Sequence, residues 1–454
     1  MSRIRRLAAH LLRPLSRSSE RFLQSFAENA RIKKFEHVFV IGSYDFKKTV
    51  ATQQKRAAVL ALAVSKRLDR SSSIAVIGGG VAGLSACATL LKLGFKATLF
   101  EQKGTLLPLQ RRCHDRYIHP DLYDWPMSEG LGELCLAGLR WKADFADNVC
   151  RQLIDSFDEI KRDAADRFTP AVATTVRRMQ EDRAGSRTTY TVFDAKEFHH
   201  AGFDAVLFAV GFGPERKVSF GSRIQGYWEN STLTHCKGTK EKPSRILVSG
   251  NGDGGLISVL DCALKEFSQP RLLQDFQEIL TDDVRRKIES VEKKIQRDVQ
   301  RGSEYNILSS YDEAFSKHIE SWRSKIAHLP SDEVRVKFNG GKKGIFTPQS
   351  SILNRFLVFL LVRCGFVDLA REPLNEAMIE ELVEQDQSRF RVRRASGGID
   401  EFDFLIVRYG VNSKFFENAF PTLSDALVGQ RDFFPALQLV DAVPEDIDKY
   451  LTRL

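Results

Sequence analysis

A glycine-rich segment between a short apolar strand and a helix is the feature that most constrains how this chain can fold. The strand IAVI, at 74–77, runs directly into Gly78-Gly79-Gly80-Val81-Ala82-Gly83, and the pattern predicts a helix over 81–93. The next predicted strand, 96–100, is followed by Glu101. A G-x-G-x-x-G motif between a strand and a helix, with an acid at the end of the next strand, predicts a dinucleotide-binding βαβ unit.

Each residue of this motif has a physical role. Gly78 permits the tight turn, Gly80 lets the backbone contact a pyrophosphate because it has no Cβ, and Gly83 lets the helix pack closely on the strand. The N–H groups at the helix N-terminus attract phosphates, and the Glu101 carboxylate can accept hydrogen bonds from a ribose diol. An acid at 101 argues against an adenosine 2′-phosphate at this first site. The alternative is a doubly wound domain with a vestigial loop.

With these residues the sequence resembles flavoproteins that have two dinucleotide-binding domains, a class that includes disulfide reductases and flavin-containing monooxygenases. The resemblance covers roughly 74–260 and, more weakly, 400–412. It implies an α/β fold, in which a Rossmann-like FAD-binding domain is joined to a second dinucleotide-binding-like domain. It also implies which residues hold the ADP part of FAD: Gly78, Gly79, Gly80, Val81, Ala82, Gly83, Glu101 and Gln102.

Two further segments carry the resemblance. Residues 174–178 fall where the class places a strand whose backbone reaches the adenine, which implies a role for Val176. Residues 203–214 resemble a buried strand of the class that ends in Ala-Thr-Gly, read here as Ala209-Val210-Gly211, and imply that Gly211 lies close to the cofactor. Residues 403–410 are a candidate second copy of that segment. A weaker similarity, to uncharacterised bacterial FAD-dependent oxidoreductases, rests on 52–57, on 119–126 and on the second glycine loop, and implies no substrate.

The sequence also departs from this class. No two of the seven cysteines form a C-x-x-C pair, which removes the redox-active dithiol of a disulfide reductase and is typical of free thiols in a reducing compartment. The signature stretch of flavin-containing monooxygenases is not found between the domains. The late Gly-Asp pair that contacts the ribityl chain is not evident, and 439–443 is a poor substitute. The resemblance therefore supports cofactor and fold better than reaction.

A second glycine loop follows the strand RILV at 245–248. Its glycines are Gly250, Gly252, Gly254 and Gly255, and by position it resembles the nicotinamide-nucleotide domain of the same class. Asp253 would repel phosphates unless it turns away to cap the helix that follows the loop. The expected next strand with a ribose acid is not visible, since the chain becomes helical there. Two interpretations stay open: NAD(P)H binds here, or the loop packs near the flavin or binds another substrate.

An aromatic loop at 116–126 is predicted to lie near the flavin end of the cofactor. Arg116, His119 and Tyr123 are the candidate catalytic residues, because such side chains can orient a substrate, stack on a flavin or carry a proton. His119 is the candidate for acid–base work. The alternative is a rigid proline-bounded turn whose aromatic side chains belong to the core.

The predicted domains are a basic N-terminal arm at 1–36, an FAD-binding domain at 37–240 and 401–454, and a second domain at 241–400. The arm contains nine basic and three acidic residues, so much of the net charge of +9 lies there. No nucleic-acid reader motif accompanies that charge, and we expect no nucleic-acid partner. The arm is either a transit-like or membrane-surface helix, or a basic helix that packs on its own protein or frays.

A helical insertion is predicted near 268–330, within the second domain. It carries an apolar stripe formed by Val284, Ile288, Val291, Ile295 and Val299. The stripe indicates either a lid, or a contact with a partner or a second copy, or simple packing on the domain core.

The sequence thus predicts a cytoplasmic FAD-dependent oxidoreductase with no transmembrane segment and no metal site. NAD(P)H would reduce it, and electrons would pass to oxygen or to an organic acceptor, with a small molecule as substrate. Two alternatives stay open: an FAD-dependent oxidase that uses no nicotinamide, and a non-catalytic sensor or scaffold that binds FAD or NAD.

Overall fold

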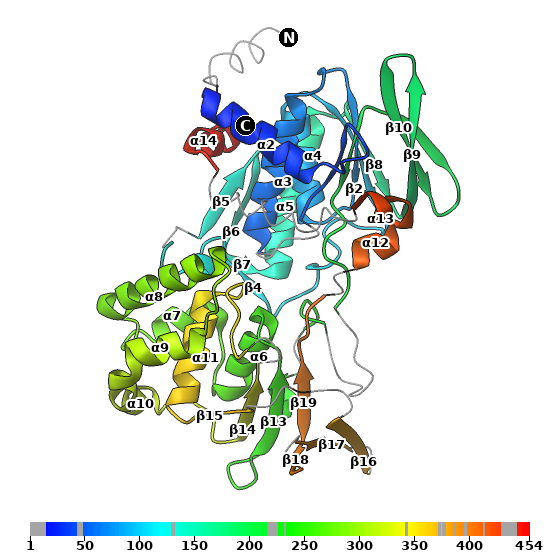
Figure 1. Cartoon of the computed structure of the whole chain (residues 1–454). Helices are drawn as coiled ribbons and strands as arrows, with labels where there is room; N and C mark the ends of the chain where they lie inside the picture. Colours follow the sequence, from blue (N-terminus) through cyan, green and yellow to red (C-terminus); the bar gives the residue numbers. More distant parts are fainter. Residues whose placement is uncertain are drawn as a thin grey trace.

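The chain forms two α/β units, which Figure 1 shows one above the other. The computed structural model describes residues 15–42, 49–128, 132–215, 226–230, 233–340, 344–370, 374, 378–384, 387–394, 397–411, 414–427 and 443–454. Each unit is built on a parallel sheet, so the predicted fold class is confirmed. The two units have separate cores, one around each sheet.

The first unit is built on a five-stranded parallel sheet of order β1-β12-β2-β3-β8. Its strands are β1 (Val38–Val40), β2 (Ser73–Ile77), β3 (Lys96–Glu101), β8 (Phe168–Val172) and β12 (Ala205–Phe208). The central strands β2 and β12 are apolar and buried along nearly all their length, as expected for a parallel sheet covered on both faces.

Helices cover one face of this sheet, and a small antiparallel sheet covers the other. The helices are α3 (Val50–Ser65), α4 (Val81–Lys92) and α5 (Ala146–Asp163). The antiparallel strands are β9 (Val176–Ala184), β10 (Arg187–Asp194) and β11 (His199–Phe203). The α3 helix begins with a capping box in which Thr49 and Thr52 exchange side-chain and backbone hydrogen bonds, which satisfies two backbone donors.

The second unit repeats this plan. Its parallel sheet has the order β15-β14-β13-β19, with β13 (Ser244–Ser249), β14 (Val334–Asn339), β15 (Val367–Leu369) and β19 (Phe404–Val407). Helices α6 (Asp253–Ala263) and α11 (Ile352–Arg363) pack on one face, against Ile246 and Val248. The antiparallel strands β16 (Ile379–Glu384), β17 (Gln387–Arg393) and β18 (Ile399–Phe402) lie on the other face, where Leu247 contacts Phe390 and Phe402.

The order of elements is the same in the two units. The first runs β2, α4, β3, α5, β8, then β9–β11, then β12, and the second runs β13, α6, β14, α11, β15, then β16–β18, then β19. Short elements lie outside this plan in the first unit: β4 (Tyr117–Ile118), η1 (Leu122–Asp124), β5 (Glu133–Leu136), β6 (Leu139–Lys142) and β7 (Asp144–Phe145). The second unit carries the insertion instead.

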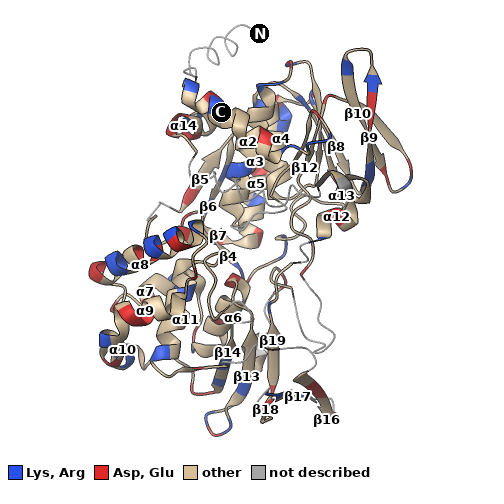
Figure 2. Ribbon diagram, viewed as in Figure 1, with Lys and Arg blue, Asp and Glu red and all other residues tan. Residues whose placement is uncertain are grey.

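The predicted helical insertion is present between α6 and β14. It consists of α7 (Leu272–Asp275), α8 (Asp282–Gln300), α9 (Ile307–Phe315) and α10 (Ile319–Ile326). Val284, Ile288 and Ile295 of the predicted stripe are buried in the core of the second unit, whereas Val299 is exposed. Lys, Arg, Asp and Glu alternate along the outer side of α8 (Figure 2). Apart from Val299, the stripe is therefore packed against the core of the second unit.

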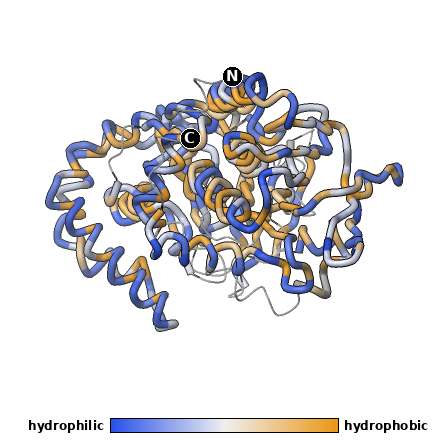
Figure 3. The backbone as a smooth tube through the Cα atoms, turned by 90° about the horizontal axis from the view of Figure 1, so that it is seen from above, coloured by the Kyte–Doolittle hydropathy of each residue, from blue (hydrophilic) through white to orange (hydrophobic). Residues whose placement is uncertain are grey.

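The first and the last helices that the structure describes pack on the first unit. Helix α2 (Arg17–Ala30) buries Leu23 and Phe26 in the first core, so this part of the predicted basic arm is a helix packed on its own protein; residues 1–14 lie outside the described part. The helices α12 (Phe415–Ala419), α13 (Pro421–Leu427) and α14 (Glu445–Arg453) also lie there. Seen from above, hydrophobic stretches run through the middle of the molecule (Figure 3).

One predicted domain boundary differs from the division that the strand pairing shows. We predicted that residues 401–454 belong to the first domain, but β19 pairs in parallel with β13 and lies in the second sheet. The chain returns to the first unit only from Phe415, where Phe416 and Phe420 pack on Phe208. The other boundaries of the predicted division stay predictions.

Replacing Gly83 by alanine is expected to destabilise the first unit. A Cβ there would meet the carbonyl oxygen of Gly78 at 1.8 Å, so α4 would have to move away from the turn, at a cost of about 1–3 kcal/mol. Gly104→Ala is the matched control, because nothing lies within 4 Å of its Cβ position. Urea unfolding followed by circular dichroism would measure both, and equal stabilities would contradict this packing.

Candidate functional site

The first glycine loop is held by backbone contacts from both neighbouring strands. Its first residue, Gly78, has a φ of +113°, and its N–H donates to the carbonyl oxygen of Phe100 at 2.8 Å. A Cβ on Gly78 would lie 2.3 Å from the carbonyl oxygen of Ala209, at the end of β12. Only glycine fits here, because the conformation is left-handed and the neighbouring backbone is too close for a side chain.

The loop presents an open surface at the start of α4. Gly80 is the N-cap of α4, no side chain caps the helix, and nothing lies within 4 Å of the Cβ position of Gly80. The first-turn N–H groups, which include those of Val81 and Ala82, have no side-chain acceptor at the cap. Such a helix end is suited to an anionic ligand.

Glu101 is placed beside this open surface. It is the last residue of β3 and only 5% exposed. One carboxylate oxygen accepts from the N–H of Gly79 at 2.7 Å, and the other accepts from the N–H of Lys103 at 2.7 Å. Each oxygen keeps a second lone pair, so the carboxylate can still accept bonds from a ribose diol.

The structure brings Val176 and Gly211 to the same edge of the sheet. The N–H of Thr174 donates to the carbonyl oxygen of Glu101 at 2.9 Å, which places the start of β9, at Val176, next to the end of β3. Gly211 follows β12 with a φ of +72°, and nothing lies within 4 Å of its Cβ position. Gln102 is exposed beside Glu101.

These residues fit the ADP part of a dinucleotide. The cradle at Gly80 is open, the backbone donors of α4 face it, and a buried carboxylate stands at the ribose position. The cofactor-binding role of each of these residues stays a prediction.

The second glycine loop has the same geometry. Gly250 has a φ of +136°, and its Cβ would meet the carbonyl oxygen of Arg408 at 2.2 Å. A Cβ on Gly255 would lie 1.9 Å from the carbonyl oxygen of Gly250. Gly252 is the N-cap of α6, and its Cβ position is open. This loop too therefore offers a helix N-terminus and an open glycine to a phosphate group.

Asp253 turns away from this loop. One of its carboxylate oxygens accepts from the N–H of Ser351 at 2.8 Å and from the side chain of Asn354 at 2.9 Å. These donors belong to the start of α11. Burial raises the pKa of Asp253, and the two hydrogen bonds oppose that rise. Asp253 therefore turns away from the loop as expected, but toward the start of α11 and not as a cap of α6, the helix that follows its own loop.

Tyr227 and Arg408 flank the second loop, and sequence reasoning missed both. The Cβ position of Gly254 lies 3.2 Å from the Tyr227 ring and 3.7 Å from Cδ of Arg408. The Arg408 guanidinium lies 3.6 Å from the Glu215 carboxylate. Burial lowers the pKa of Arg408 and the Glu215 charge raises it, while burial raises the pKa of Tyr227 to about 12. Only the alignment of 403–410 with 203–214 could have directed attention to Arg408.

Arg116 connects the aromatic loop to this place. Its side chain is 1% exposed, its Nε donates to the carbonyl oxygen of Tyr227 at 2.8 Å, and its guanidinium lies 4.7 Å from the centre of the Tyr227 ring. An isolated bridge also pairs Glu215, after β12, with Val411, after β19. The ends of the two parallel sheets therefore meet near Arg116.

The other aromatic-loop residues dock on the second unit. The Tyr123 hydroxyl donates to the carbonyl oxygen of Gln349, and Trp125 is buried in the second core. The loop therefore joins the two units, and Trp125 is a core residue. Catalytic roles for Arg116, His119 and Tyr123 stay predictions.

His119 is engaged in the turn that it begins. Its Nδ1 accepts from the N–H groups of Asp121 and Leu122, each at 3.0 Å, so Nδ1 is unprotonated in this arrangement. Burial lowers the pKa of His119, and the charge of Asp121 opposes that shift. The ring therefore supports a turn in its neutral form.

None of the seven cysteines forms a disulfide. Burial raises the pKa of Cys150 to about 12 and that of Cys364 to about 11, and it also raises the pKa of Cys113. A thiol with a raised pKa is a poor nucleophile and a poor redox centre. This agrees with the lack of a C-x-x-C pair.

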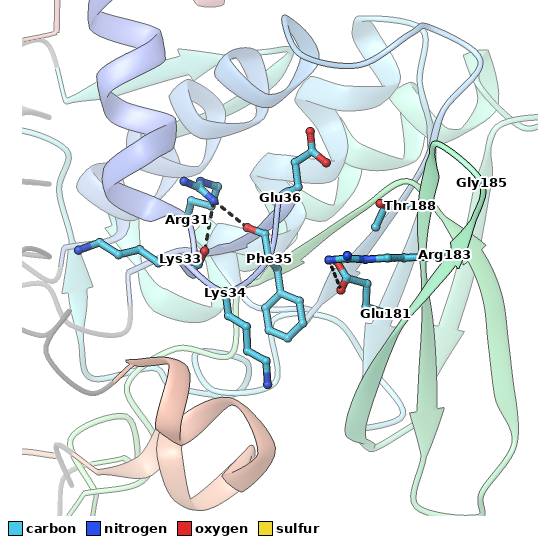
Figure 4. Close-up of a pocket in the computed structure, with 9 residues that line it drawn as sticks. All are labelled: Arg31, Lys33, Lys34, Phe35, Glu36, Glu181, Arg183, Gly185 and Thr188. Carbon is cyan, nitrogen blue, oxygen red and sulfur yellow. Dashed lines mark hydrogen bonds and ion pairs between the residues drawn. The ribbon is translucent and has the colours of Figure 1, made fainter.

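A separate cavity of about 380 Å³ lies between residues 31–36 and the β9–β10 hairpin (Figure 4). None of its lining residues belongs to a glycine loop. Its charged side chains are partly paired: Arg183 lies 3.1 Å from Glu181, and Arg31 lies 2.8 Å from Glu28. We assign it no ligand.

Two kinds of arrangement are absent from the part of the chain that the structure describes. In that part, no group of three or more His, Cys, Asp or Glu side chains is arranged to hold a metal ion. Over the same residues, every helix is too short or too polar to cross a membrane.

Two glycine loops of matching geometry thus stand at the ends of the two parallel sheets. A comparison with protein families agrees: residues 72–298, half of the chain, match the family described as pyridine nucleotide-disulphide oxidoreductase. The chain therefore belongs to the pyridine nucleotide-disulphide oxidoreductase family. It is a family of FAD-dependent oxidoreductases, so FAD is the cofactor, with NAD(P)H as a candidate second nucleotide.

Several solved structures are similar in general arrangement. They include bacillithiol disulfide reductase Bdr (YpdA) from Staphylococcus aureus, 12% identical over 75% of this chain and 77% of that one, with a TM-score of 0.37. Thioredoxin reductase of T. acidophilum is 9% identical over 83% and 100%, with a TM-score of 0.37. A flavin monooxygenase from Stenotrophomonas maltophilia is 13% identical over 82% and 98%, with a TM-score of 0.36. No curated protein sequence matches the chain.

Replacing His119 by asparagine is expected to remove one source of acid sensitivity. The lowered pKa of His119 means that its contribution to stability is present above its ordinary value of about 6.5 and is lost as the pH falls through the lowered value. Asparagine keeps an acceptor for the same N–H groups and does not titrate. Unfolding midpoints at several pH values would measure this, and parallel pH dependence in wild type and variant would contradict it.

Proposed function

We propose that this protein is an FAD-dependent oxidoreductase that is reduced by NAD(P)H and passes the electrons to oxygen or to a small organic acceptor. The observation that carries this proposal is the pair of matching loops, Gly78–Gly83 and Gly250–Gly255, at the ends of two sheets that meet at the Glu215–Val411 bridge. Two dinucleotides bound in this way would direct their reactive ends toward a shared region.

The first loop is proposed to hold FAD. Gly80 and the start of α4 would contact the pyrophosphate, Glu101 the ribose diol, and the backbone at Val176 the adenine. Gly211 would let the chain pass close to the rest of the cofactor. When bound, the flavin supplies hydride acceptance and onward electron transfer.

The second loop is proposed to hold the nicotinamide nucleotide. Gly252 and the start of α6 would contact its pyrophosphate, while Gly254 lies against Tyr227. Arg116, Tyr227 and Arg408 lie where the two sheets meet and would exclude water and orient the reactants. None of them is assigned a proton-transfer step.

A disulfide is not the proposed acceptor, although the family name includes one. No disulfide joins any of the seven cysteines, and no C-x-x-C pair is present. A dithiol relay on this chain therefore has no residues to carry it. Oxygen or an organic molecule stays the proposed acceptor, in a reducing compartment as predicted from the cysteines.

Replacing Gly80 by valine is expected to remove FAD while leaving the fold intact. The Cβ position is open and the φ of −75° suits any residue, but the side chain would occupy the space needed by the pyrophosphate. Affinity for FAD should fall on the order of a hundred-fold. Flavin fluorescence titration would measure it, with circular dichroism as the check on folding, and unchanged affinity would contradict the assignment.

Replacing Gly252 by valine is expected to leave FAD bound and to slow its reduction. Its Cβ position is equally open, and its φ is −83°. The efficiency of anaerobic flavin bleaching by NAD(P)H should fall on the order of a hundred-fold, with unchanged flavin content. Wild-type flavin that no nicotinamide nucleotide bleaches would favour the oxidase or sensor alternatives, and equal rates in variant and wild type would place the nucleotide elsewhere.

A further inference from the structure

The two units can be compared residue by residue, because their strands have the same register. The N–H of Gly78 donates to the carbonyl oxygen of Phe100 at 2.8 Å, and the N–H of Gly250 donates to the carbonyl oxygen of Asn339 at 2.9 Å. Asn339 therefore occupies in the second unit the place of Phe100 in the first. The next residue is Glu101 in the first unit and Gly340 in the second.

The ribose position of the second unit has no carboxylate and no room for one. A Cβ on Gly340 would lie 2.3 Å from Cα of Ile345 and 2.6 Å from the carbonyl oxygen of Gly344. Backbone therefore fills the space that the Glu101 side chain occupies in the first unit. The side chain of Asn251, which takes the place of Gly79, donates to that same Gly344 oxygen at 3.1 Å.

On the opposite side of the second loop, Arg408 and Glu215 form an ion pair. The residue whose carbonyl oxygen contacts the first glycine is Ala209 in the first unit and Arg408 in the second. Glu215 faces the Arg408 guanidinium at 3.6 Å, and Arg116 adds another cation against Tyr227. The acid within the loop, Asp253, is directed to the start of α11. Relative to the first site, the second therefore lacks the carboxylate at the ribose position, while the charge of Arg408 is balanced by that of Glu215.

We infer, on the basis of the proposed function, that the second site takes NADPH in preference to NADH. A carboxylate at the ribose position accepts bonds from the diol of NADH and repels a 2′-phosphate, and glycine does neither. Without that carboxylate, the additional phosphate of NADPH meets no repulsion at this position. The first site, with Glu101, keeps the opposite preference, which suits the unphosphorylated adenosine of FAD.

Anaerobic reduction of the FAD-loaded chain by the two nucleotides tests this inference. The apparent second-order rate constant for flavin bleaching should be higher with NADPH than with NADH by a factor on the order of ten or more. Equal values, or a higher value with NADH, would overturn it.

Two variants of Asn251 test the electrostatic cause. Asn251→Asp has the same shape and returns a carboxylate to the place next to Gly340, so the NADPH-to-NADH ratio should fall by a factor on the order of ten. Asn251→Ser loses the same hydrogen bond to Gly344 but adds no charge, and it should keep the wild-type ratio. A ratio that falls equally in both variants, or in neither, would contradict the charge explanation.

A binding measurement separates this inference from the proposed function. Calorimetry on the FAD-loaded chain with adenosine 2′,5′-bisphosphate and adenosine 5′-monophosphate needs no hydride transfer. Tighter binding of the bisphosphate supports the inference even if neither NADPH nor NADH bleaches the flavin, an outcome that would contradict only the proposed function. Equal binding, preference for the monophosphate, or binding of neither would overturn the inference.

Discussion

Both candidate sites depend on one contact, the close approach of a helix to the turn that precedes it. In each unit the third glycine of the motif lies so near the carbonyl oxygen of the first that a Cβ would stand within 1.8 or 1.9 Å of it. That approach brings the N-terminus of α4 or α6 over the end of its strand, where the helix end and the N-cap glycine can meet a phosphate. A third parallel strand completes each site, β12 in the first unit and β19 in the second. The residue that follows this strand, Ala209 or Arg408, closes the far side of the turn.

The two units share this backbone frame but differ in the side chains at their strand ends, and those side chains set the charge of each site. The first unit has the Glu101 carboxylate at the end of β3. The second unit has Gly340 at the matching place after β14, and Arg408 follows β19. The aromatic loop and the 226–230 segment lie between the units, where Arg116 holds Tyr227 against the second glycine loop. Family membership gives the cofactor class, and the buried thiols argue against a disulfide acceptor.

The elements predicted from the sequence are those with strong local signals. The strand, glycine loop, helix and acid at 74–101 are local in sequence and were predicted within a few residues, as were β12, β13 and β19. The strand β14 was missed because the helices α7–α10 separate it from α6, so its pairing with β13 depends on distant residues. The positions of Trp125 and Tyr123 could not be predicted for the same reason, since α11 and the second core fix them. Tyr227 and Arg408 carry no motif, and their place at the site depends on the folded register alone.

The central claim is that one chain holds two different dinucleotides at once. Native mass spectrometry of the full chain, with FAD and NADPH both present, measures this directly. The account predicts a species that contains one FAD and one nicotinamide nucleotide per chain. A chain that carries either nucleotide but never both, or that carries FAD in both positions, would contradict the account.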